Sequence, residues 1–312
     1  MLLCAIRYFL RILYLIAAIC FLNFDKVNSQ DVDSREITYV DSASLDYKTY
    51  VAKEAEFFSA SPWRALFLEQ VTTDTARIAK RLIDRSPKSV SLRSMPSDML
   101  QFPVAEKKEL FFSVMSRIAK FHNNVIAERR ERLIRLLHLS NDDVFLEKMV
   151  VEYSLERVDS KMLTRTDTLH ALLTRVDCIP LSLILAQAAI ESGWGTSRFA
   201  REGNNLFGQR VWNDNIPGMK ASGRSNAKFR LAVYPNISES VKSYLRNLNT
   251  HPFYESLRVI RQRKRNRGES VFGLDLVGEI GSYSIRGEAY ISDVTQIIEF
   301  NNLTNLDEEA CK

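Results

Sequence analysis

The stretch that decides the fold is AQAAIESGWGTSRFA, residues 186–200. It continues an apolar run, LSLILAQAAI at residues 181–190, whose length and composition are typical of a buried helix. Pro180 stands where a proline favours the first turn of a helix, and Gly193 is a typical helix end. We therefore predict a buried helix that ends near Gly193 and carries one carboxylate, Glu191, in its last turn.

Downstream of this helix the sequence changes character twice. EGNNLFGQ at residues 202–209 is rich in glycine and asparagine, and residues 210–235 (RVWNDNIPGMKASGRSNAKFRLAVYP) combine alternation with turn residues. The second pattern predicts one or two short hairpins. Helical periodicity resumes after Ile237, and we expect helices to continue through residues 275–303.

Upstream, residues 51–165 contain few glycines or prolines and repeat apolar residues at helical spacing. The clearest case is the stretch at residues 107–139, whose abundant charges are most simply its solvated face. We interpret residues 51–165 as an all-helical region that serves packing rather than chemistry. The apolar stripe of residues 107–139 consists of Leu110, Phe111, Val114, Ile118, Phe121, Ile126, Leu133, Leu136 and Leu137.

The first 29 residues have the pattern of a secretory signal. Arg7 and Arg11 precede an apolar run at residues 12–24, which is too short to span a bilayer comfortably. A cleaved signal is favoured over a retained anchor, so we expect a protein exported to the periplasm or cell envelope. Peripheral or signal-anchor attachment to the membrane is the alternative. Residues 30–50 read as a polar linker.

Composition excludes some classes of protein. Hydrophobic residues make up 46% of the chain and charged residues 26%, as in a soluble globular protein. The net charge of +5 does not require a nucleic-acid partner. Six basic residues cluster in RVIRQRKRNRGE, residues 258–269, but no aromatic residue interleaves with them. We expect a solvated helix end there and no nucleic-acid binding.

The cysteines and histidines suggest no metal site. The four histidines show no HExxH spacing, and His251, next to Pro252, is interpreted as a locally hydrogen-bonded helix-boundary residue. Beyond the leader, Cys178 and Cys311 remain. A buried thiol at Cys178 is favoured, with a disulfide to Cys311 as the alternative. We predict neither a metal nor an organic cofactor.

Glu191 is the candidate functional residue. Gln187 lies four residues before it, so both side chains share one helix face. The negative end of the helix dipole and apolar neighbours such as Trp194 would each raise a carboxyl pKa. A carboxylic acid kept protonated near neutral pH is suited to donate a proton to a departing oxygen, as glycosidic bond cleavage requires. An ordinary solvent-exposed glutamate at a helix end is the alternative.

The sequence motifs themselves are more specific. AQAAIESGWGTSRFAREGNNLFGQ, at residues 186–209, strongly resembles the N-acetylglucosaminidase domain of bacterial peptidoglycan hydrolases, a lysozyme-like family. NLNTHPFYESLR at residues 247–258 and YSIRGEAYISDV at residues 283–294 extend the resemblance, which covers roughly residues 90 to 300.

The resemblance implies a predominantly α, α+β fold. A lysozyme-like glucosaminidase domain with a small β-hairpin lobe would occupy residues 166–303, after the helical region and before a tail at residues 304–312. It further implies a monomeric hydrolase that cuts the β-1,4 bond after N-acetylglucosamine in peptidoglycan glycan strands, with Glu191 as general acid. Tyr283 matches a tyrosine across the cleft that holds the acetamido group or orients water. The expected substrate-binding residues are Gln187, Trp194, Asn205, Phe207, Gln209, Tyr234 and Tyr290.

The chain differs from many members of this family because its hairpin segment contains few acidic residues. Many relatives supply a second carboxylate from the hairpin, but here Asp214 falls early and the next acid is Glu239. Glu239 is a candidate catalytic residue that reads equally well as a stabilising first-turn acid. Substrate assistance by the sugar's own acetamido group is the simpler mechanism. A non-catalytic wall-binding or scaffolding protein and a wall amidase remain alternatives.

Overall fold

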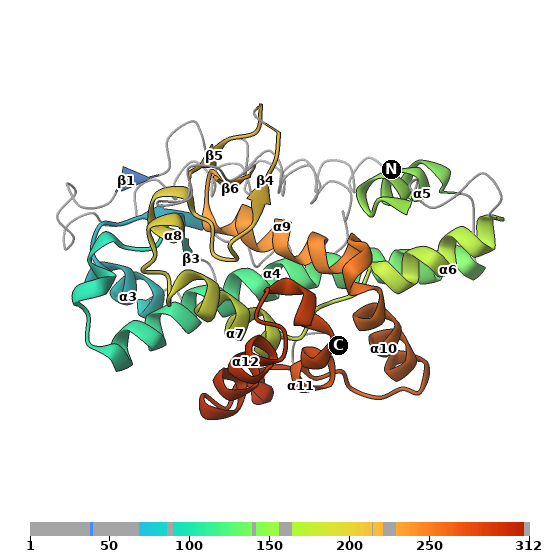
Figure 1. Ribbon diagram of the computed structural model, residues 1–312. Coiled ribbons are helices and arrows are strands. Elements are labelled where there is room, and N and C mark those ends of the chain that lie inside the picture. The colour runs from blue at the N-terminus through green and yellow to red at the C-terminus, as the bar shows by residue number, and fades with distance from the viewer. Residues whose placement is uncertain are drawn as a thin grey trace, which may run out of the picture. The chain divides into compact units, whose positions relative to one another are not determined.

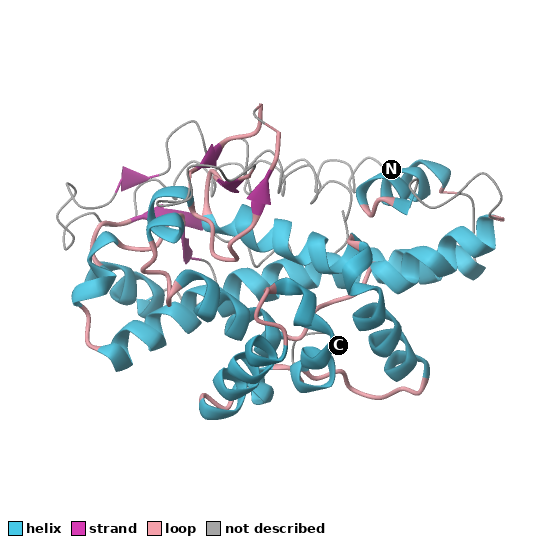
Figure 2. Ribbon diagram, viewed as in Figure 1, coloured by secondary structure: helices cyan, strands magenta, loops and turns pink. Residues whose placement is uncertain are grey.

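The computed structural model describes residues 38–39, 69–85, 90–138, 142–155, 164–213, 215–220 and 229–308 (Figure 1). Within these residues helices predominate and the strands are short, which confirms the predicted α+β, predominantly α class (Figure 2). The predicted signal at residues 1–29, Asp214 and Cys311 lie outside them. No helix in the described ranges is long and apolar enough to cross a bilayer.

The amino-terminal part of the described chain contains strands that the sequence analysis missed. After β1 (Thr38–Tyr39), the strands β2 (Glu69–Thr72) and β3 (Val90–Leu92) pair in parallel and are joined by α3 (Ala76–Arg85). The prediction of an all-helical region was therefore wrong here. Strands of three or four residues are too short to produce a readable alternation, whereas the intervening helix has a strong periodic pattern.

The long helix α4 (Val104–His138) follows a short 3-10 turn, η4 (Ser97–Gln101). Its apolar stripe faces the core as predicted, although Phe121 and Leu137 are only partly buried. Two helices come next, α5 (Asp143–Glu152) and α6 (Arg165–Arg175). Asp142 caps α5, and Thr164 forms a capping box with Asp167 at the start of α6.

Helix α7 (Leu181–Ser192) is the centre of the fold, and α4 lies beside it (Figure 1). Every residue of α7 from Leu181 to Ala189 is buried. Asn123 of α4 donates to the Ile179 carbonyl oxygen at 2.8 Å and accepts from the Ile179 amide at 3.2 Å. These two bonds fix the start of α7 against α4, so residues on both sides of the predicted boundary at 165/166 share one core.

The predicted hairpin segment forms a small antiparallel sheet. After α8 (Arg198–Gly203), the strands β4 (Arg210–Val211), β5 (Gly218–Met219) and β6 (Arg230–Ala232) assemble in the order β4-β6-β5. The remaining elements are helical, as predicted. They are α9 (Ile237–Thr250), η7 (Pro252–Tyr254), α10 (Glu255–Asn266), α11 (Gly273–Leu276), η8 (Val277–Tyr283), α12 (Glu288–Phe300) and η9 (Leu303–Leu306).

The basic cluster on α10 is only in part the solvated helix end that we predicted, because Arg263 and Arg267 are exposed whereas the two arginines before them are not. Arg258 and Arg261 are buried, and Arg261 donates to the Thr174 and Asp177 carbonyl oxygens. Its Nε lies 3.6 Å from an Asp177 carboxylate oxygen. Burial alone would raise the pKa of Asp177, but Arg261 and its neighbouring arginines outweigh it and hold the pKa below its ordinary value. The cluster thus satisfies the carbonyl end of α6 and the turn into α7.

Candidate active site

Glu191 lies in the last turn of α7, where the chain turns sharply. Gly193 and Trp194 both adopt left-handed backbone conformations, with φ of 57° and 59°. The Trp194 amide donates to the Ala189 carbonyl oxygen at 2.9 Å, which closes the helix end. This exit confirms the predicted stop at Gly193 and leaves the Glu191 side chain partly buried.

A chain of buried hydrogen bonds leads to the Glu191 carboxylate. Tyr244 of α9 donates its hydroxyl to Gln187 Oε1 at 2.7 Å. Gln187 Nε2 donates to the Tyr290 hydroxyl oxygen at 3.0 Å. The Tyr290 hydroxyl in turn donates to the Glu191 carboxyl group, a bond that acts to lower the pKa of Glu191. The predicted pair on one face of α7 therefore forms one polar network.

The pKa of Glu191 is raised above its ordinary value. Burial is the main cause, because it penalises the charged form. The hydrogen bond from Tyr290 and the positive charges of Arg210 and Arg286 act in the opposite direction without cancelling it. The predicted direction is confirmed, and the carboxyl group keeps its proton to a higher pH than a free glutamate.

The GNNLFG loop between α8 and β4 lies directly beside the carboxyl group. Gly208 has φ of 62°, and a Cβ there would stand 3.0 Å from Glu191 Oε2. Asn205 holds the loop in shape: its Nδ2 donates to the Gln209 and Ala232 carbonyl oxygens at 2.9 and 3.0 Å. Its Oδ1 accepts from the Gln209 amide at 3.0 Å. Asn205 therefore positions the loop from a buried place, 1% exposed.

Aromatic rings form the surroundings of this network. Phe207 stacks on Tyr244 with ring centroids 3.9 Å apart, and Tyr283 stacks on Tyr290 at 5.9 Å. The Tyr283 hydroxyl donates to the Phe207 carbonyl oxygen at 2.7 Å. Its proton is thus used within the protein, and its oxygen retains only the capacity to accept a bond.

Gln209, Tyr234 and Glu239 are placed by a second set of bonds. The Tyr234 hydroxyl lies 2.7 Å from Gln209 Oε1 and 3.0 Å from Ser243 Oγ, and Gln209 Nε2 donates to Ser243. Glu239 lies in the first turn of α9, where its amide donates to the capping Asn236 and its carboxylate is 4.0 Å from Lys242 Nζ. These contacts account for Glu239 as a stabilising first-turn acid. Its catalytic role stays a prediction.

Trp194 takes a packing position. Its indole meets Phe111 and Phe112 of α4 edge-on, with centroids 5.8 and 5.2 Å away, and Lys108 Nζ lies 4.6 Å from the ring centroid. The sequence analysis expected this ring to cover Glu191 and to contact substrate. The observed contacts join the end of α7 to α4, and a contact with substrate stays a prediction.

Sequence reasoning missed three residues of this site, namely Tyr244, Arg210 and Arg286. Tyr244 stands in the helical pattern of residues 238–249 as an ordinary core residue. The two arginines had no local signal, because they approach Glu191 from the hairpin and from the turn before α12.

The residues considered for rival chemistries have structural contacts. His251 Nδ1 accepts from the Phe253 amide at 3.3 Å, which confirms the predicted helix-boundary role. Cys178 is buried, with its Sγ 3.5 Å from the Asn123 carbonyl oxygen. Among the residues that the structure describes, no group of three or more histidines, cysteines or acids could hold a metal ion.

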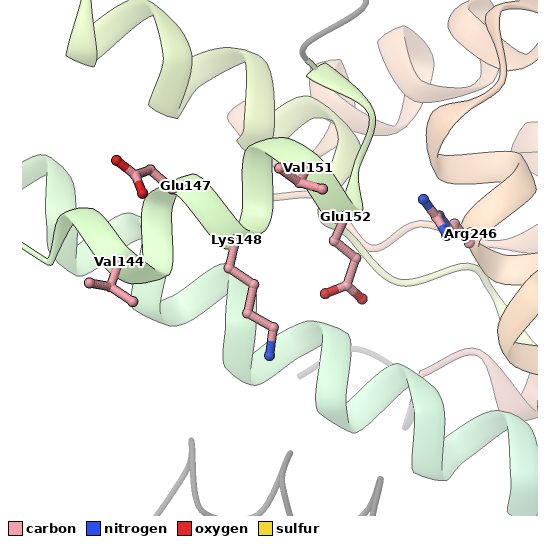
Figure 3. Close-up of a pocket in the computed structure, with 6 residues that line it drawn as sticks. All are labelled: Val144, Glu147, Lys148, Val151, Glu152 and Arg246. Atoms are coloured by element: carbon pink, nitrogen blue, oxygen red, sulfur yellow. The ribbon is translucent and has the colours of Figure 1, made fainter.

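A hollow of about 500 Å³ lies elsewhere on the described surface, beside α5 and Arg246 of α9 (Figure 3). Its lining shares no residue with the network around Glu191. The lining residues are Val144, Glu147, Lys148, Val151, Glu152 and Arg246.

Comparison with known proteins identifies the domain that carries Glu191. Residues 167–303 match the family model described as mannosyl-glycoprotein endo-beta-N-acetylglucosaminidase, the glucosaminidase family. Protein bax of Escherichia coli K12 is 40% identical over 130 residues, which cover 41% of this chain and 44% of that protein. The peptidoglycan hydrolase FlgJ of the same strain is 34% identical over 93 residues, or 25% of this chain and 29% of FlgJ. The chain thus spans less than half the length of these curated relatives.

Among solved structures, the catalytic domain of the autolysin Auto from Listeria monocytogenes is 23% identical, with a TM-score of 0.33. It aligns over 57% of this chain and 96% of that domain. Residues 167–303 thus match the glucosaminidase family model, and 130 residues of the chain are similar to protein bax.

Proposed function

We propose that this protein is a peptidoglycan hydrolase that cleaves the β-1,4 bond after N-acetylglucosamine, with Glu191 as the general acid. The observation that carries the proposal is the position of the Glu191 carboxyl group, which is partly buried beside the GNNLFG loop and has a raised pKa. That group ends the buried helix α7 and receives the hydrogen-bond chain through Tyr290, inside the region that matches the glucosaminidase family. The name of FlgJ adds peptidoglycan as the substrate class.

In this mechanism Glu191 gives its proton to the glycosidic oxygen as the bond between that oxygen and the anomeric carbon breaks. Tyr290 then stabilises the carboxylate that forms, because its hydroxyl already donates to Glu191. Burial therefore favours the protonated acid before the transfer, and the hydrogen bond from Tyr290 favours the carboxylate that remains after it.

A second protein carboxylate is not required if the sugar assists. The 2-acetamido oxygen of N-acetylglucosamine attacks the anomeric carbon as the leaving oxygen departs. Water later attacks the same carbon and returns its proton to Glu191. The Tyr283 oxygen, whose own proton is donated to Phe207, can accept a hydrogen bond from the acetamido N–H. The proposed mechanism uses no metal or organic cofactor.

The proposed site of action is the periplasm or cell envelope, as the leader pattern of residues 1–29 predicts. The proposed partner is the glycan strand of the wall, and the enzyme acts as a monomer. Attachment to the membrane through the leader remains the alternative for its placement.

The test is digestion of purified sacculi by the full chain and by Glu191→Gln, followed by mass spectrometry of the released muropeptides. We expect wild type to release fragments with N-acetylglucosamine at the new reducing end. Loss of the general acid should lower the rate by about 10²–10⁴-fold. Glu239→Gln is the matched control and should keep most of the activity, because Lys242 and the helix end account for that side chain.

Other products would decide among the alternatives. Released peptides with intact glycan would identify an amidase, and binding to sacculi without any cleavage would identify a scaffolding protein. Full loss of activity in Glu239→Gln, with the fold preserved, would contradict the mechanism with one protein acid.

A further inference from the structure

Two exposed side chains lie at the end of the small sheet, Arg210 in β4 and Trp212 directly after it. Arg210 pairs with Leu231 across β4 and β6, and Val211 pairs with Arg230. Opposed residues in an antiparallel pair share a face, and successive residues alternate between faces. Arg210 and Leu231 therefore lie on one face, and Val211 lies on the other. Trp212 follows directly after β4.

The face that carries Leu231 packs against the body of the protein. Met219 of β5 pairs with Leu231 and so shares its face. A Cβ at Gly203 of α8 would stand 3.0 Å from Met219 Sδ, so this face packs on α8. Leu231, on the same face, is only 9% exposed.

Trp212, directly after β4, is 69% exposed, so its indole is accessible to solvent. A single exposed apolar side chain is ordinary on a protein surface. Trp212 differs from the other exposed ones in its position, because it follows Arg210 by two residues and Arg210 lies close enough to Glu191 to lower its pKa. The indole is thus a candidate contact for a ligand at the rim of the domain.

This rim is adjacent to the reacting carboxyl group. A Cβ at Gly208 would meet Glu191 Oε2 at 3.0 Å, and Arg210 follows only two residues later. Trp212 is four residues from Gly208, which limits the separation of their Cα atoms to roughly 14 Å. The Arg210 guanidinium lies 4.4 Å from the centroid of the Phe229 ring. The chain that leads away from Glu191 therefore carries a cation, Arg210, and an aromatic ring, Trp212, two residues apart.

We propose that Trp212 and Arg210 form a binding subsite for a sugar of the glycan strand that carries a carboxylate-bearing peptide. The indole packs on the apolar C–H face of the sugar ring, and the Arg210 guanidinium pairs with the peptide carboxylate. This inference rests on the proposed function, because it assumes that a peptidoglycan strand lies across Glu191. It adds the prediction that strands with peptides are preferred to neutral N-acetylglucosamine oligomers.

The experiment measures binding without turnover. The full-length chain carrying Glu191→Gln is combined with Trp212→Ala, Trp212→Phe, Arg210→Gln or Phe300→Ala, and binding to intact sacculi is measured by co-sedimentation. Phe300→Ala is the matched control, because this ring at the end of α12 is 80% exposed and lies outside the sheet. Thermal melts confirm that each variant is folded, which is expected because the substituted side chains are exposed.

We expect Trp212→Ala to weaken binding by at least about five-fold, as for an aromatic contact that matters. Trp212→Phe should restore part of the affinity, and Phe300→Ala should not change it. Arg210→Gln should weaken binding to intact sacculi but not to neutral N-acetylglucosamine oligomers, which carry no carboxylate.

Equal binding by Trp212→Ala and its Glu191→Gln parent would overturn this inference and leave the proposed function standing, provided that wild type still releases reducing ends. Absence of both binding and cleavage by wild type would overturn both. An equal loss for Arg210→Gln on neutral N-acetylglucosamine oligomers and on intact sacculi would overturn the assignment of the carboxylate.

Discussion

Removing one hydroxyl group, in the variant Tyr290→Phe, tests the electrostatics of the site most directly. The Tyr290 oxygen accepts from Gln187 Nε2 at 3.0 Å and donates to Glu191. The ring itself is 1% exposed and stacks on Tyr283, so phenylalanine fills the same space. The variant therefore removes two hydrogen bonds and little packing.

The size of the effect follows from what each bond does. A hydrogen bond to a charged group contributes about 1.5–3 kcal/mol, which corresponds to about 1–2 pKa units. The bond from Tyr290 favours the charged carboxylate, so its loss raises the pKa of Glu191 further. Because the carboxyl group is partly exposed, solvent screens the interaction, and we expect a rise at the lower end of this range. Gln187 loses an acceptor in the core, which should cost about 1–3 kcal/mol of unfolding free energy.

Carbon-13 NMR titration of the glutamate carboxyl groups measures this pKa, with Glu191→Gln assigning the signal. In sacculus digestion, the basic limb of the pH–rate profile should move to higher pH by the same amount, because the general acid stays protonated longer. Tyr283→Phe is the matched control. Its hydroxyl donates to the Phe207 carbonyl oxygen, so its removal should leave the pKa of Glu191 nearly unchanged.

A folded Tyr290→Phe protein whose Glu191 pKa is unchanged or lower would refute this reasoning. It would mean that the Tyr290 proton is not directed at the carboxylate, and that the chain from Tyr244 does not end at Glu191.

Two further predictions concern stability and the loop beside the acid. Burial lowers the pKa of His122 to about 3, below its unfolded value near 6.5, so the unfolded chain binds this proton first as pH falls. Unfolding free energy should therefore drop by about 2 kcal/mol between pH 6.5 and 5 from this group, and urea titrations should show a flatter dependence in His122→Gln. Gly208→Ala should lower the unfolding free energy by about 1–2 kcal/mol, because alanine is strained in the left-handed backbone conformation. It should lower activity more than stability, because the new methyl group displaces Glu191 Oε2. An active, equally stable Gly208→Ala enzyme would contradict the placement of this loop.

Local sequence patterns predicted the helices and the position of Glu191 well. The apolar run before Glu191 and the glycine after it define α7, since burial and a left-handed C-cap are local requirements. The stripe on α4 and the hairpin segment were equally readable. The parallel pair β2 and β3 was not, because its pairing partner lies across a helix and each strand is too short to show a period.

The chemistry of the site was decided by tertiary structure. The sequence placed Gln187 one turn before Glu191, but only the packing of α9 and α12 on α7 brings Tyr244 and Tyr290 to that pair. It also turned Trp194 toward α4 and buried Arg261 beside Asp177, against expectation. A residue's periodicity reports which face it occupies. Desolvation and hydrogen bonding of its polar atoms depend on elements distant in sequence, and they set the pKa of Glu191.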